Sequence, residues 1–155
     1  MKRSRLRFVG IGNDGEPKVA IGQLSETVRE VCEKTATLYQ TADSFVPWVG
    51  YLAIENGVVV GTCAFRSPPR NCEVEIAYFT FPEFEGRGFA TEMARHLIQI
   101  VKDTEPGTRI FAFTLPEKNA SNRVLQKLGF RFAGETHDED EVVVWQWWEL
   151  PLVGK

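Results

Sequence analysis

The sequence contains few of the residues that form disulfides and bind metal ions. Among its 155 residues there are three cysteines and two histidines. Cys32, Cys63 and Cys72 are odd in number and have no CxxC spacing, so neither a disulfide framework nor a zinc site is predicted. With His96 and His137 as the only histidines, a histidine-rich metal site is not expected either. We therefore expect a protein that works without a metal ion.

Long apolar runs and clustered positive charge are also missing. No stretch approaches the roughly 18 apolar residues of a membrane span, and the N-terminal part has no apolar segment typical of a signal peptide. The net charge is −3, and the only basic cluster is Lys2-Arg3-Arg5-Arg7 near the chain end. Nucleic-acid binding requires lysines and arginines gathered on one face. These absences favour a cytoplasmic protein that binds neither a membrane nor nucleic acid.

The residues that are present fit one globular domain over residues 1–155, since 43% are apolar and 25% are charged. The turn dipeptide Asn56-Gly57 joins two strand-like runs and predicts a tight hairpin. Apolar periodicity and turn residues predict, in chain order, a strand over 5–11, a helix from Ser25 to Tyr39, the hairpin of 48–55 and 58–66, a strand over 73–81, a helix over 86–104, a strand over 109–115, a helix over 120–128, a strand beginning at Phe132-Ala133 and a strand over 142–149. Because strands and helices interleave, we expect an α/β or α+β mixed sheet with helices on both faces.

A pair of glycines stands between the strand over 73–81 and the helix that follows it. Gly86 and Gly88 permit a tight turn, and the helix start adds about half a positive charge, so the turn is suited to bind phosphate. Arg87 could add a charged contact. The alternative is that the glycines only shape a loop. The lack of GK[ST] and of GxGxxG argues against a Walker A loop and a dinucleotide fold.

The longer run from Glu75 to Glu92 resembles motif A of the GNAT superfamily of N-acetyltransferases, in particular its ribosomal-protein N-acetyltransferase (RimJ/RimL)-like branch. A second block, Asn119 to Phe130, is similar to a block of the same branch that carries Asn and Ser and ends in Gly-Phe. The resemblance covers roughly residues 48–149, and residues 1–47 match only in outline. One departure is Glu85, which stands where the family has Gln or Arg.

The resemblance implies a mixed, mostly antiparallel central sheet of about six to seven strands, with a splayed strand pair where acetyl-coenzyme A binds. Main-chain groups near Phe79 and Phe81 would pair with the pantetheine arm, and Asn119 would hydrogen-bond the coenzyme. The pyrophosphate would be held by the backbone amides of Glu85, Gly86, Arg87, Gly88, Phe89 and Ala90. We therefore expect acetyl-coenzyme A as the acyl donor and an amine as the acceptor.

Acetyl transfer to an amine requires a neutral nucleophile, and Glu75 is the candidate base. It interrupts an otherwise apolar strand and lies close to the position where family members carry a catalytic glutamate. The alternative is that Glu75 forms an ion pair with an arginine such as Arg66 or Arg109. Glu73, two residues earlier on the same face, is the reserve and could act through water.

The leaving thiolate requires a proton or a hydrogen-bond donor. Many relatives use a tyrosine at the position occupied here by Leu125, so we expect Ser121 to take this role. Ser121 could instead be the N-cap of its helix. Strand alternation places Tyr78 on the face opposite Glu75, where we expect it in the core. A main-chain N–H near Phe79 would polarise the thioester carbonyl.

Two further features have ordinary explanations. The acidic stretch over 137–141 could attract a cationic acceptor, but such runs are usually solvated turns. The tryptophans Trp145, Trp147 and Trp148 fit a core or a homodimer surface as well as an acceptor pocket.

We expect direct attack in a ternary complex, because no cysteine or serine is flanked by a recognisable base. The alternatives are a non-catalytic acyl-coenzyme A sensing module and an unrelated interaction domain. The identity of the amine is left open.

Overall fold

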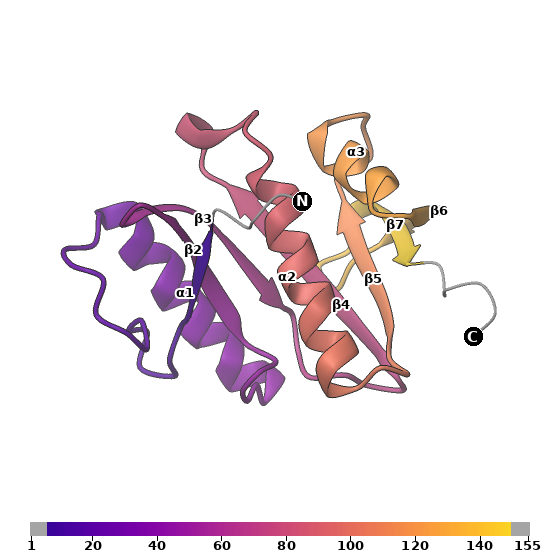
Figure 1. The fold of residues 1–155 in the computed structure, drawn as a ribbon. Coiled ribbons are helices and arrows are strands. Elements are labelled where there is room, and N and C mark those ends of the chain that lie inside the picture. Colours follow the sequence, from indigo (N-terminus) through magenta and orange to yellow (C-terminus); the bar gives the residue numbers. More distant parts are fainter. Residues whose placement is uncertain (1–5, 150–155) are drawn as a thin grey trace.

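Seven strands form one sheet in the computed structural model, which describes residues 6–149 (Figure 1). Of the basic cluster near the chain end, Lys2, Arg3 and Arg5 lie outside the described residues. The elements in chain order are β1 (Arg7–Gly10), α1 (Glu26–Ala42), β2 (Gly50–Glu55), β3 (Val58–Phe65), β4 (Glu73–Thr80), the short 3₁₀ helix η1 (Pro82–Phe84), α2 (Phe89–Thr104), β5 (Arg109–Thr114), α3 (Ala120–Lys127), β6 (Phe130–His137) and β7 (Val143–Glu149).

The strand order in the sheet is β1-β2-β3-β4-β5-β7-β6. Every neighbouring pair is antiparallel except β4 and β5, which are parallel. The mixed, mostly antiparallel sheet is therefore confirmed. The expected hairpin joins β2 to β3, and Asn56 and Gly57 take φ values of 49° and 81°, as its tight turn requires.

Helices cover both faces of the sheet, as expected. Leu52 and Ile54 of β2 pack with Val28 of α1, whereas Ala53 between them packs with Met93 of α2. Successive strand residues point to opposite faces, so α1 and α2 lie on opposite sides of the sheet. α1 begins at the predicted N-cap, because the hydroxyl of Ser25 accepts a hydrogen bond of 3.2 Å from the amide of Val28.

Two element boundaries differ from the expectation. The helix expected over 86–104 begins at Phe89, because Gly86 and Gly88 have left-handed backbones with φ of 79° and 83°. The last but one strand extends over Phe130–His137, well beyond Phe132-Ala133, because it pairs with β7 along its length. No helix within residues 6–149 is long and apolar enough to cross a membrane.

Candidate active site

β4 and β5 pair at only three positions, from Glu73 opposite Arg109 to Glu75 opposite Phe111. Beyond this point β5 continues beside β7, while β4 pairs with β3 alone. Figure 1 shows the two strands close together at one end and diverging toward the start of α2. The predicted splayed strand pair is therefore present, and its apex lies at Glu75 and Phe111.

The main chain of β4 determines which residues face the opening. The amide of Phe81 donates to the carbonyl of Val60 at 2.9 Å, and the carbonyl of Phe79 points at Gly61, where an added Cβ would overlap it. Both residues therefore turn their peptide groups toward β3. By alternation, the peptide groups of Ile76, Tyr78 and Thr80 face the opening. The main-chain groups of Phe79 and Phe81, which were expected to pair with pantetheine, are thus turned toward β3 and away from the opening.

The glycine turn presents backbone amides at the start of α2. Gly88 is the N-cap of the helix, and in residues 6–149 the amides of Gly86 and Gly88 donate to no protein acceptor. The buried ring of Phe89 fixes the start of the helix. By contrast, the amide of Glu85 already donates to the carbonyl of Pro82, at 3.4 Å. The helix start is therefore a ready anion site, centred on the two glycines.

The side chain of Arg87 points away from this anion site. Its guanidinium forms an ion pair of 2.8 Å with Glu55 of β2 and lies 4.9 Å from the centre of the Phe89 ring. A bound phosphate would have to compete with the Glu55 carboxylate for this cation. The contribution expected of Arg87 thus depends on its backbone more than on its charge.

Glu75 lines a cavity of about 330 Å³ on the α1 side of the sheet. Burial raises the pKa of its carboxyl to about 7, with Glu139 and Asp138 adding to the shift and Arg66 opposing it. Glu75 forms no ion pair in the described part of the chain. The cavity is also lined by side chains from four other segments: Leu38, Thr41 and Ala42 of α1, Arg66, Ser67, Arg70 and Asn71 before β4, Phe111 of β5, and Glu139 after β6.

Glu73 lies on the same face and is the carboxylate that pairs with an arginine. Its side chain is 3.4 Å from the guanidinium of Arg109. The structural role considered for Glu75 thus belongs to Glu73. Glu75 is left as a half-buried carboxyl with a pKa near neutrality, which is a feature of a general base.

The start of α3 contains Asn119 and Ser121. The side-chain oxygen of Asn119 accepts a hydrogen bond of 3.2 Å from the amide of Asn122, so Asn119 is the N-cap and the capping role considered for Ser121 is wrong. The side-chain NH₂ of Asn119 is not used by this cap. Ser121 is half-buried in the first turn of α3. Leu125, at the position of the family tyrosine, is fully buried.

Tyr78 packs against the core as expected, but its hydroxyl makes a contact that the sequence did not predict. The hydroxyl reaches α3 and donates to the carbonyl of Ser121 at 3.3 Å. Burial raises the pKa of the phenol, which keeps its proton at neutral pH. Strand alternation predicted the face of Tyr78, but only the packing of α3 beside β4 brings its hydroxyl to Ser121.

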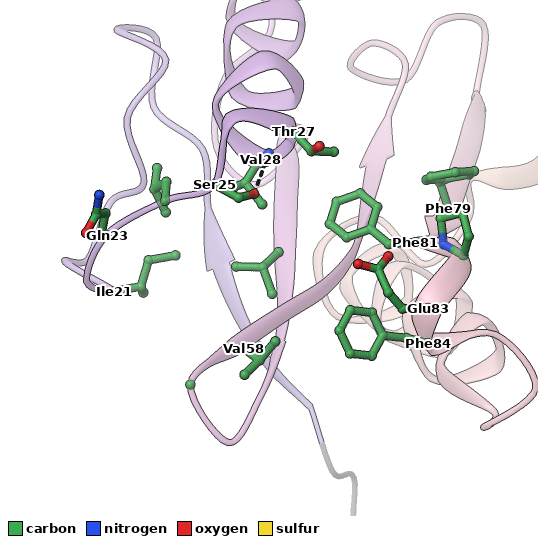
Figure 2. A pocket seen from close by; sticks show the side chains of 14 residues that line it. Ile21, Gln23, Ser25, Thr27, Val28, Val58, Phe79, Phe81, Glu83 and Phe84 are labelled. Atoms are coloured by element: carbon green, nitrogen blue, oxygen red, sulfur yellow. Dashed lines mark hydrogen bonds between the residues drawn. The ribbon is translucent and has the colours of Figure 1, made fainter.

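A second, larger cavity of about 660 Å³ lies at the N-terminal end of α1. Figure 2 shows the rings of Phe81 and Phe84 on one side, with the carboxylate of Glu83 between them, and Ile21 and Gln23 on the other side. The half-exposed ring of Phe79 also lines it. Its walls are mainly apolar, so it offers surface for packing and few groups for acid–base chemistry.

Comparisons with known proteins agree with this geometry. Residues 14–131 match the family model of the acetyltransferase (GNAT) domain. A search of curated protein sequences found no match. Within residues 6–149, no three His, Cys, Asp or Glu side chains form a group that could hold a metal ion.

Solved structures share the fold at low sequence identity. The ribosomal L7/L12 α-N-protein acetyltransferase RimL in complex with coenzyme A is 18% identical, with 83% of this chain and 73% of that chain covered and a TM-score of 0.63. The ribosomal-protein-S5-alanine acetyltransferase from Vibrio fischeri is 14% identical over 100% and 98% of the two chains, with a TM-score of 0.67. The microcin C7 self-immunity acetyltransferase MccE, in complex with acetyl-CoA and AMP, is 17% identical over 81% and 71%, with a TM-score of 0.63.

Proposed function

Because this chain belongs to the GNAT acetyltransferase family, we propose that it transfers acetyl from acetyl-coenzyme A to a primary amine, on a protein N-terminus or a small molecule, by direct attack in a ternary complex. The observation that supports this most is the position of Glu75. A half-buried carboxyl with a pKa of about 7 lines a cavity at the apex where β4 and β5 part.

The coenzyme would lie along the opening between β4 and β5. Its pyrophosphate would accept hydrogen bonds from the turn Glu85–Ala90, chiefly from the amides of Gly86 and Gly88. Its pantetheine arm would pair with the unpartnered edge of β4 at Ile76, Tyr78 and Thr80. Asn119 would donate from its side-chain NH₂. Two of the similar structures were solved with coenzyme A or acetyl-CoA bound, which supports this placement.

Glu75 would accept the proton of the attacking amine. At pH 7 an α-amine with a pKa of about 8 costs about 1 kcal/mol to neutralise, whereas a lysine costs about 4.6 kcal/mol. A base with a pKa near the working pH is matched to this task, because much of it is ionised while it still binds a proton well. Glu75 and the α1 side of the sheet therefore define where the amine enters.

The reaction also requires a polarised thioester carbonyl and a hydrogen-bond donor for the leaving thiolate. Both requirements would be met close to Tyr78. Its amide faces the opening and would donate to the oxygen of the thioester carbonyl as negative charge develops there. The nitrogen–carbon bond forms, the carbon–sulfur bond breaks, and the electron pair leaves with the sulfur. The hydroxyl of Ser121 would donate to this sulfur, with the hydroxyl of Tyr78 beside it as a second donor.

The test measures thiol release from acetyl-coenzyme A with a panel of amines, using Glu75→Gln and a control, Glu30→Gln, on the exposed side of α1. We expect Glu75→Gln to lower kcat/KM by about 10²- to 10⁴-fold and to leave coenzyme binding intact. The control should behave as the wild type. Full activity of Glu75→Gln at neutral pH would contradict the assignment.

A sensing module is the second candidate, because the fully buried Leu125 puts no hydroxyl where relatives carry the tyrosine. Calorimetry with coenzyme A separates the candidates. Binding without turnover of any amine would favour the sensor. No detectable binding would remove both and favour an interaction domain.

A further inference from the structure

The cavity that contains Glu75 is also lined by two arginines, Arg66 and Arg70, whose side chains form no ion pair within residues 6–149. We propose that the acceptor is a small amino acid, with its amine at Glu75 and Glu139 and its carboxylate at Arg66 and Arg70. This inference rests on the proposed function, since it assumes that the cavity is the acceptor site.

Arg66 is placed beside Glu75 by the register of the sheet. Phe65 pairs with Ile76, and the amide of Arg66 donates to the carbonyl of Glu75 at 3.1 Å, so the two residues lie opposite each other. Side chains of directly opposite residues share a face, with Cβ atoms about 5 Å apart. Arg66 and Glu75 both line the cavity. A cation therefore stands next to the expected base.

Arg70 lines the same cavity from the segment before β4. Its main chain is fixed by two hydrogen bonds with Glu73, of 2.9 and 3.0 Å. In the part of the chain that the structure describes, neither Arg66 nor Arg70 forms a side-chain ion pair or hydrogen bond. The nearest candidate, Glu73, is already bound to Arg109. Two guanidinium groups are thus available to a ligand.

Two other arginines near β4, Arg87 and Arg109, have guanidinium groups that bind carboxylates of the protein. Arg87 binds Glu55 at 2.8 Å, and Arg109 binds Glu73 and stacks on the ring of Trp148 at 4.1 Å. Arg66 and Arg70 differ from these two arginines, because neither forms an ion pair within residues 6–149. A guanidinium recognises a carboxylate well, because its parallel N–H groups match the two oxygens.

The opposite charge in the cavity comes from the segment after β6. Glu139 lines the cavity, and both Glu139 and Asp138 lie close enough to Glu75 to act on its ionisation. An ammonium group would be attracted to this side. A polyamine would also meet the two arginines, and a purely anionic acceptor would meet the acids. An acceptor with one charge of each sign satisfies both sides.

The size of the cavity favours a small acceptor. Its volume of about 330 Å³ is near the lower end of the roughly 300–1,000 Å³ typical of ligand sites. The larger cavity at the start of α1 has mainly apolar walls and no arginine. It cannot select a carboxylate. The charge pattern therefore assigns the carboxylate to the Glu75 cavity and not to this larger one.

The experiment compares three acceptors that have the same side chain: the amino acid, its carboxamide and the amine without a carboxyl group. Each set is made with the amine on the α, β or γ carbon, so that the distance between the amine and the carboxyl group varies. For the wild type, kcat/KM should be about 10- to 100-fold higher for the best carboxylate acceptor than for its carboxamide, as expected for a charge-assisted hydrogen bond. The preferred spacing reports the distance between the two subsites.

Variants then locate the carboxylate. Arg66→Gln and Arg70→Gln should each lower the ratio of carboxylate to carboxamide kcat/KM by about tenfold, mainly through KM. Arg95→Gln, at an exposed position on α2, is the control and should keep the wild-type ratio. Rates are compared on the pH-independent plateau, because Arg66 also acts on the pKa of Glu75. Coenzyme binding by each variant verifies that it is folded.

The outcomes separate this inference from the proposed function. Acetylation of amines without a carboxylate preference, or a preference for polyamines or for peptides with a blocked carboxyl group, would overturn the inference and leave the function standing. An unchanged ratio in both arginine variants would also overturn it. Coenzyme binding without turnover of any amine would overturn the proposed function, and this inference with it.

Discussion

The two halves of β4 are built in different ways. The first half, Glu73 to Glu75, pairs with β5, and its acidic side chains line a cavity together with four other segments. The second half, Ile76 to Thr80, has a partner only in β3 and leads into the glycine turn before α2. One half offers side chains and the other offers peptide groups.

This difference has a chemical meaning in the proposed function. The coenzyme is the same in every cycle, and peptide groups at a strand edge and a helix start are suited to hold it. The acceptor has to be chosen among amines, and choice requires side chains of particular charge and shape. If this is correct, substitutions in one half of β4 should affect coenzyme binding, and substitutions in the other half should affect acceptor chemistry.

The largest effect is expected from Gly88→Val. Gly88 has a φ of 83°, which costs a β-branched residue about 1–2 kcal/mol or more, and the rearranged turn would lose amide contacts to phosphate. We expect coenzyme A affinity to fall by roughly 30- to 100-fold in calorimetry. Gly107→Val, where an added Cβ meets no atom within 4 Å, should bind normally. Normal binding by Gly88→Val would show that the turn does not hold the coenzyme.

Gly61→Ala should have a smaller effect on the same half of β4. The added methyl would overlap the carbonyl of Phe79 and lie 3.1 Å from Met93, so β4 must shift away from β3. We expect a loss of stability of about 1–3 kcal/mol and a roughly tenfold loss of coenzyme affinity. Gly107→Ala is the matched control. Lower stability with unchanged affinity would mean that the edge of β4 is not part of the coenzyme site.

Glu75→Gln should change stability in a pH-dependent way. Burial raises the pKa of Glu75 from 4.5 to about 7, so the folded protein binds this proton more tightly than the unfolded chain. Its stability therefore falls as pH rises from about 4.5 through 7. Gln stays neutral, so the variant should be more stable than the wild type by about 1–2 kcal/mol at pH 8 and similar at pH 4.

Denaturant unfolding at the two pH values measures this difference. Glu30→Gln, which changes an exposed carboxylate, should show no such trend. An equal difference in stability at both pH values would mean that Glu75 is solvated and its pKa ordinary. A more stable but inactive variant would show that the acceptor half of β4 sacrifices stability for its chemistry.

The smallest effect is expected from the two hydroxyls at the junction of the halves. Ser121→Ala and Tyr78→Phe each remove one candidate donor to the leaving sulfur, and one neutral hydrogen bond is worth about 0.5–1.5 kcal/mol. We expect kcat to fall by about 2- to 10-fold in the variant whose hydroxyl acts, with coenzyme affinity unchanged. If neither variant loses activity, water protonates the thiolate.

The elements themselves were largely predictable from local pattern. The hairpin turn Asn56-Gly57 and the N-cap Ser25 are at their expected positions, because each depends on residues adjacent in the chain. The start of α2 was placed three residues early, since a pair of glycines can either begin a helix or precede it. The length of β6 depends on pairing with β7, which no local pattern reveals.

The site was predictable only where it depends on local pattern along one strand. Alternation along β4 placed Glu75 on the face opposite Tyr78, and the structure agrees. Which carboxylate pairs with Arg109 depended on the register of β5, and the answer was Glu73. The N-cap of α3 was assigned to Ser121 as one option, but the helix begins at Ala120, as expected, and Asn119, two residues before Ser121, takes that role.

The sequence by itself determined the order of elements, the glycine turn and the presence of two carboxylates on one face of a largely apolar strand, because these depend on backbone preference and periodicity within short segments. The tertiary structure alone decided which peptide groups of β4 face the opening, which carboxylate stays unpaired and which arginines share its cavity. These depend on strand register and on the meeting of segments far apart in the chain, where burial and unpaired charge arise.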